Sequence, residues 1–175
     1  MEKVFLYLYP IKEFFSPFIH ENNNAFAILN ETIDKRYRQK GYKNVYAIFP
    51  DKEMYGLDKL SCDKLIQTDI TFSTHIVKDK SGNYQYPSEK LLLKNFHWVS
   101  ELVIGGFHYS DYVKKVGEMA LNMGINCLVD LDLTDLFFKL YNTNYFDVNF
   151  YDTKSYGRIT RCWTTCNSKE SYKYI

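Results

Sequence analysis

The chain has 175 residues, of which 46% are hydrophobic, so we expect a single α/β domain over residues 1–175 with a sizeable buried core. Its 22 basic and 21 acidic residues leave a formal net charge of +1, which argues against nucleic acid or an acidic membrane as a partner. No apolar run is long enough to span a bilayer and no secretory signal is visible, so we expect a cytoplasmic protein with reduced thiols.

The first half of the chain alternates apolar runs with amphipathic stretches. In chain order we predict a strand at 3–9, a helix at 22–39, a strand at 45–49, a short helix at 57–66, a strand at 70–77 and a helix at 88–95. Pro10 ends the first strand, Gly41 follows the first helix, and Ser88 is placed to cap the last helix. These alternations favour parallel strands joined by helices.

The stretch from Glu101 to Lys139 gives the clearest βαβ pattern in the chain. The apolar run 102–104 predicts a strand that is buried on both faces, and a glycine pair follows it. Ser110 or Asp111 is expected to cap a helix that ends at Gly124. A second strand at 126–131 and a helix through Leu140 complete the unit.

The predicted fold class is therefore α/β, a three-layer α-β-α sandwich with a mainly parallel open sheet of Rossmann-like type. After Tyr141 the pattern weakens, and the stretches 146–150 and 159–165 read as short strands. We expect residues 142–175 to form an irregular extension that packs on the domain or at an interface, so self-association is a further expectation. Cys162 and Cys166 lie there, too widely spaced for the common redox motif and too few for a zinc site.

Ligands of such sheets bind beyond the carboxyl ends of the strands. The residues that follow the predicted strands, and so form the expected pocket rim, are Tyr9, Asp51, Lys78 and Gly106. The first strand is followed by PIKEFF and not by GxGxxG, so a dinucleotide is not expected, and no cofactor is predicted.

The order of these motifs resembles the isochorismatase-like cysteine hydrolases over approximately Lys3 to Phe138, most clearly from Ile76 onward. The resemblance implies a parallel sheet between helices. It also implies a site made of an aspartate after the first strand, a lysine after a later strand, and a cysteine nucleophile at the start of the central helix.

Only one of these three residue types is present at the matching position. Lys78 falls where the family has its lysine, but Tyr9 stands at the aspartate position and Tyr112, followed by Val113, stands at the cysteine position. Tyr112 thus joins the predicted pocket rim. Because a phenol with a pKa near 10 is scarcely ionised at pH 7, the family's cysteine-hydrolase chemistry is expected to be lost.

Other residues offer different chemistry. His108 and Asp111 lie near the start of the central helix, where a histidine beside a carboxylate can act as a general base. The alternative is that Asp111 caps the helix and His108 is a surface residue. Catalytic candidates are thus Lys78, His108 and Asp111, and Lys78 is otherwise simply a solvated side chain.

Asp130 and Asp132 alternate along the second strand of the central unit and so share one side of it. They are weak candidates for holding a hard cation, and no metal is otherwise predicted. The alternative is that one of them caps the last helix and the other pairs with a basic side chain.

Three functions remain open from the sequence. The first is a binding or assembly domain without the family's chemistry. The second is a hydrolase built on His108, Asp111, Asp130 and Asp132. The third is a small-molecule or nucleotide binder whose ligand the sequence does not identify.

Overall fold

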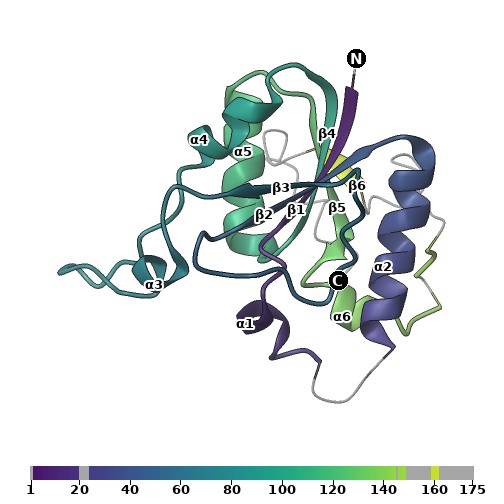
Figure 1. Ribbon diagram of the computed structural model, residues 1–175, viewed down its shortest axis with the longest axis horizontal. Helices are drawn as coiled ribbons and strands as arrows, with labels where there is room; N and C mark the ends of the chain where they lie inside the picture. The colour runs from purple at the N-terminus through teal and green to yellow at the C-terminus, as the bar shows by residue number, and fades with distance from the viewer. Residues whose placement is uncertain (1, 20–23, 145, 149–158, 162–175) are drawn as a thin grey trace.

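In the computed structural model, residues 2–19, 24–144, 146–148 and 159–161 are described. A sheet with the strand order β3-β2-β1-β4-β5-β6 forms the centre (Figure 1). Its strands are β1 (Glu2–Leu8), β2 (Lys43–Ile48), β3 (Lys64–Gln67), β4 (Val99–Gly106), β5 (Cys127–Thr134) and β6 (Ile159–Arg161). The strands from β3 to β5 are parallel to their neighbours, and β6 pairs antiparallel with β5.

Helices cover both faces of this sheet. They are α1 (Lys12–Phe15), α2 (Ala25–Arg36), α3 (Phe72–His75), α4 (Glu89–Leu93), α5 (Lys114–Asn122) and α6 (Phe137–Leu140). Residues of α4 and α5 pack in the core on one face, and residues of α1, α2 and α6 pack in the core on the other. The predicted three-layer α/β sandwich with a mainly parallel sheet is confirmed.

β1 lies in the middle of the sheet because its sequence is apolar on both faces. Leu6 and Leu8 point into the core beneath α5, whereas Phe5 and Tyr7 point into the core beneath α2. All four side chains are fully buried. A strand covered on both sides needs such a continuous apolar run, which is why this strand was easy to predict.

The predictions for residues 57–77 are wrong. The stretch 57–66 forms no helix, and its last residues belong to β3, where only Ile66 is buried. The predicted third strand at 70–77 is instead the short helix α3. Thr71 accepts a hydrogen bond from the Thr74 N–H, and the Asp51 carboxylate accepts two more backbone N–H bonds, so the first turn of α3 is capped twice.

Most of the other expected elements are present. Ser88 caps α4 as predicted, since its hydroxyl accepts a hydrogen bond from the Leu91 N–H at 3.3 Å. Residues 159–161 form the strand β6 within the stretch predicted at 159–165, whereas residues 146–148 form no strand. Cys162, Cys166 and much of the predicted extension at 142–175 lie outside the described residues.

Two further sequence predictions can be compared with the structure. Cys127 is buried in β5 and Cys62 is exposed, and no disulfide joins the two. In the described part of the chain, no helix combines the length and the apolar character that crossing a membrane requires.

Candidate functional site

The order of the strands reverses between β1 and β4, because β2 and β3 follow on one side of β1 and β5 follows on the other side of β4. The carboxyl ends at such a reversal are where ligands of open α/β sheets bind. Tyr9 follows β1 at this point, and the turn Tyr109–Val113 follows β4. This end of the sheet is the candidate site.

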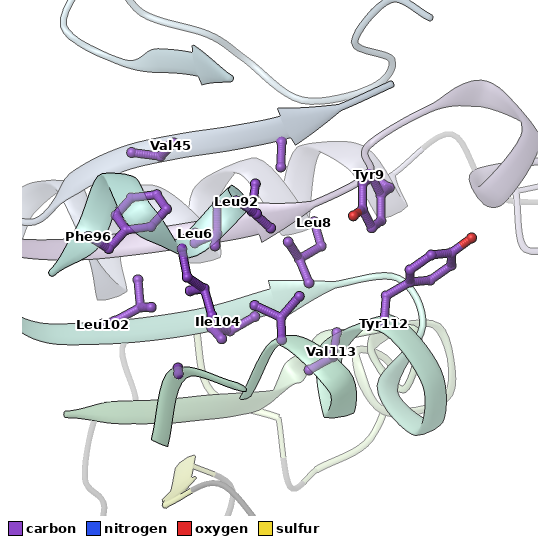
Figure 2. Packing of buried hydrophobic residues seen from close by; sticks show 14 of the residues in the cluster. Leu6, Leu8, Tyr9, Val45, Leu92, Phe96, Leu102, Ile104, Tyr112 and Val113 are labelled. Carbon is purple, nitrogen blue, oxygen red and sulfur yellow. The ribbon is translucent and has the colours of Figure 1, made fainter. Parts of the chain in front are cut away.

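Two tyrosine rings fill the candidate site (Figure 2). Tyr9 is 1% exposed and Tyr112 is 4% exposed, and their ring centroids lie 4.8 Å apart in an edge-to-face arrangement. Tyr9 also stacks on Phe49 with a centroid distance of 4.8 Å. Gly106, another predicted rim residue, allows the close approach of β1 and β4, because a Cβ atom there would lie 2.2 Å from the Leu8 carbonyl oxygen.

Tyr112 is held in place by His75. The Tyr112 hydroxyl donates a hydrogen bond to Nε2 of His75, and Nδ1–H of His75 donates to the Gln85 carbonyl oxygen at 2.5 Å. The carbonyl can only accept, so the neutral imidazole carries its proton on Nδ1. The His75 ring lies between Phe49 and Tyr86, with centroid distances of 5.6 and 5.4 Å.

Both phenols are poorly suited to act as nucleophiles. Burial raises the pKa of Tyr9 well above its ordinary value, and nearby carboxylates, Glu89 first, raise it further. Burial also raises the pKa of Tyr112, followed by the effects of Tyr9 and Asp111. Neither ring therefore provides an ionised oxygen near neutral pH.

Lys78 contacts a different tyrosine, Tyr84. It is exposed, its backbone pairs with Tyr84, and its Nζ lies 5.0 Å from the centroid of the Tyr84 ring. Both residues belong to residues 72–86, which comprise α3 and the loop after it and which we call the arm; the arm projects from one end of the molecule (Figure 1). Of the three positions matched to the family, only Tyr9 and Tyr112 come together.

Asp51 lies at the predicted edge of the sheet, but its carboxylate accepts hydrogen bonds from the arm. Its Oδ1 accepts the Phe72 N–H at 2.6 Å, and its Oδ2 accepts the Ser73 N–H at 3.0 Å and the Ser73 hydroxyl at 2.7 Å. Slight desolvation raises the pKa of Asp51, but the hydrogen bonds from Ser73 and Phe72 outweigh it and lower the pKa to about 2. The carboxylate is thus a helix cap and not a free ligand.

His108 is paired with Asp135 and not with Asp111. Nδ1 of His108 lies 3.9 Å from Asp135 Oδ2, and Asp135 Oδ1 accepts the Tyr109 N–H at 2.7 Å. Partial burial raises the pKa of Asp135, but His108 and the Tyr109 N–H outweigh it and hold the pKa below its ordinary value. Both side chains are partly exposed, at the carboxyl ends of β4 and β5.

Asp111 instead bonds to the two side chains that lie over it. Its Oδ2 accepts the Tyr86 hydroxyl at 2.9 Å, and its Oδ1 accepts Lys115 Nζ at 2.5 Å. It neither caps α5 nor faces the His108 ring. Its role is to hold the end of the arm against the first turn of α5.

Asp130 and Asp132 form a buried ion-pair network. Arg36 Nη1 donates to both oxygens of Asp130 at 3.0 Å, and Nη2 donates to Asp132 Oδ2 at 2.8 Å. The Tyr37 hydroxyl donates to Asp130 at 2.5 Å, and Nη2 of Arg36 also donates to the Asp147 carbonyl. The guanidinium occupies the place that a cation would need, so the two aspartates are structural. Among the residues that the structure describes, no cluster of metal-ligating side chains is present.

Sequence reasoning missed Arg36 and the role of His75. Arg36 follows Leu29 and Ile33 at helical spacing, so it lies on the buried face of α2. A basic residue on that face, together with two aspartates on one side of a buried strand, was the available signal. His75 gave no such signal, because its hydrogen-bond partners Gln85 and Tyr112 lie 10 and 37 positions later in the chain.

The described strands and helices form the mainly parallel sheet between helices that the sequence resemblance implied. No protein-family model matches the chain, and no curated protein matches it.

Two solved structures are similar in fold. A protein from Leishmania major proposed to be a Mar1 ribonuclease has 14% identity over 76% of this chain, with a TM-score of 0.49. The chain spans 64% of the length of that protein. A protein from Oleispira antarctica proposed to be an isochorismatase hydrolase has 18% identity over 76% of this chain and 75% of its own, with a TM-score of 0.47.

Proposed function

We propose that this chain is a binding or assembly domain that lacks cysteine-hydrolase chemistry. The observation that carries the proposal is the packing of Tyr9 against Tyr112 at the reversal of strand order. The position matched to the nucleophile holds a buried phenol whose hydroxyl is bonded to His75. The position matched to the aspartate holds a second buried ring and no carboxylate, and burial raises the pKa of Tyr112, which opposes its ionisation even beside His75.

Hydrolysis assays test this proposal. The full chain is incubated with p-nitrophenyl esters and with a panel of aromatic and aliphatic amides, and product release is compared with buffer alone. We expect no release above buffer, and no change when Lys78 is replaced by alanine. Turnover that Lys78→Ala abolishes would contradict the proposal, since Lys78 is the one matched family residue that is kept.

A second candidate function is hydrolysis that uses His108 and Asp135. The specific observation in its favour is their pairing at the carboxyl ends of β4 and β5, with the Asp135 carboxylate fixed by the Tyr109 N–H. A carboxylate at Nδ1 of a histidine favours the tautomer whose Nε2 can accept a proton from water.

The same assays separate the two candidates. Ester or amide hydrolysis that is lost in His108→Ala and reduced in Asp135→Asn, but unchanged in Lys78→Ala, supports this second function. Activity that is the same in wild type and His108→Ala, or absent from both, excludes it.

A further inference from the structure

The tip of the arm exposes apolar side chains to solvent. Ile76 is 53% exposed, Val77 is 60% exposed and Tyr84 is 46% exposed. They lie next to one another, because residue 78 pairs with residue 84 across the arm. Contiguous apolar side chains on a projecting segment are typical of an interaction surface.

The arm is held in a fixed position by several bonds to the rest of the domain. Asp51 caps α3, Tyr112 binds His75, and Asp111 binds the Tyr86 hydroxyl. The first of these bonds comes from the end of β2, and the other two come from the turn after β4. Because these bonds fix the base of the arm, they reduce the conformational entropy that is lost when the arm binds.

The charge at the arm tip is basic. Lys78 and Lys80 are exposed there, and the Asp79 carboxylate between them accepts the N–H groups of Ser81 and Asn83 within its own turn. The tip therefore combines two ammonium groups with the apolar surface of Ile76 and Val77.

An open groove on the other side of the molecule has the opposite charge. It lies between α2 and residues 58–60, has a volume of about 550 Å³, and is lined by Ala27, Glu31, Asp34, Asp58 and Leu60 together with Asn30 and Arg38. Glu31 pairs with Lys35 and Asp34 pairs with Arg38. The Asp58 carboxylate has no such pair within the described residues, and the Leu60 side chain is 44% exposed.

We propose that the arm tip of one copy of this chain docks in the α2 groove of a second copy. The groove offers the Asp58 carboxylate beside an exposed leucine, and the tip offers two lysines and an exposed valine, so charge and apolar surface are both complementary. The arm and α2 lie at opposite ends of the molecule (Figure 1). The contact is therefore head-to-tail, and it continues from copy to copy as an open chain or a ring.

This inference names the two surfaces, the arm tip and the α2 groove, through which the proposed assembly occurs. It rests on that role but not on the loss of catalysis, because hydrolysis assays and measurements of mass are separate experiments. A catalytically active protein can still assemble through the arm, and an inactive one can be a monomer.

A mixing experiment tests the contact. The arm variant is Val77→Asp with Lys80→Glu, and the groove variant is Asp58→Lys with Glu31→Lys. Both pairs of positions are on the surface, and circular dichroism checks that each variant folds. By sedimentation velocity, we expect the wild-type chain to form species larger than a dimer as concentration rises, and each variant alone to associate at least about tenfold more weakly.

The mixture gives the decisive result. The arm variant keeps an intact groove and the groove variant keeps an intact arm, so together they can make one contact and no more. We expect a one-to-one dimer that does not grow. A monomeric wild type, a mixture that forms no dimer, or association that survives both pairs of substitutions would overturn the proposal.

Discussion

The Tyr112 hydroxyl donates a hydrogen bond to Nε2 of His75, a residue that lies 37 positions earlier in the chain. This bond joins the turn after β4 to the first helix of the arm. The Tyr112 side chain, which packs at the end of the sheet, therefore also helps to position the arm. The Tyr112 hydroxyl therefore has a structural role.

Replacing Tyr112 by phenylalanine should destabilise the domain by about 1–3 kcal/mol. The ring and its packing remain, but Nε2 of the buried His75 loses its hydrogen-bond partner, and an unsatisfied buried acceptor is costly. Urea unfolding followed by circular dichroism measures the change. Tyr86→Phe is the matched control, because it removes a hydroxyl bonded to the partly exposed Asp111 and should cost less. Equal losses of stability in the two variants would show that burying the His75–Tyr112 hydrogen bond adds nothing to the free energy of unfolding.

Replacing Arg36 by methionine should cost about 3–5 kcal/mol, since it leaves the carboxylates of Asp130 and Asp132 buried without a counter-charge. The control is Lys35→Met, which removes a partly exposed i,i+4 pair with Glu31 and should cost less than about 1 kcal/mol. Both values come from urea unfolding.

A combined variant tests the explanation for Arg36. Adding Asp130→Asn and Asp132→Asn to Arg36→Met removes the buried negative charges and should recover part of the lost stability. If the combined variant is less stable than Arg36→Met alone, the loss arises from packing and not from unpaired charge.

Much of the fold could be predicted because its signals are local. The buried strands β1 and β4 contain continuous apolar runs, β5 begins with one, and α4 begins at a serine that caps it. β3 was not predicted, because it is a short edge strand with one buried residue, Ile66. Its neighbour α3 depends on Asp51, which lies 21 residues before the N–H that it accepts.

The pairing of His108 with Asp135 could not be predicted from the sequence, because it does not depend on a local signal. His108 meets Asp135 because the register of β4 and β5 shifts between Ile104 and Gly106, so that Gly106 lies opposite Thr134. A shift of this kind changes which side chains lie opposite one another, and no local sequence pattern in either strand indicates it. The sequence therefore led us to expect His108 beside Asp111, the carboxylate that is nearer in the chain.

The cap of α3 by Asp51 predicts a specific pH dependence. The Ser73 and Phe72 hydrogen bonds lower the pKa of Asp51 from its ordinary 3.8 to about 2. A carboxylate whose pKa is lower in the folded state stabilises the fold above its unfolded pKa, and this contribution is lost as pH falls through the folded value. Asp51→Asn should therefore be less stable than wild type near neutral pH, and the difference should shrink between pH 3.8 and about 2.

Urea unfolding of both proteins across this pH range provides the measurement. Ser73→Ala is the companion variant, because it removes one hydrogen-bond donor and should raise the pKa of Asp51 toward its ordinary value. A stability difference that stays constant down to the acid end of the range would mean that these donors do not hold Asp51 ionised.

Gly106 should tolerate no side chain. Its φ is +98°, and a Cβ atom would lie 2.2 Å from the Leu8 carbonyl oxygen and 2.4 Å from the Leu8 nitrogen, both on the central strand. Gly106→Ala must therefore separate β1 from β4 at the point where Tyr9 meets Tyr112, and we expect a loss of more than about 3 kcal/mol. Gly41→Ala is the control, because its φ is +79° but no atom lies within 4 Å of the added Cβ. That variant should cost only the backbone strain of about 1–2 kcal/mol, so similar losses at the two glycines would contradict the steric argument.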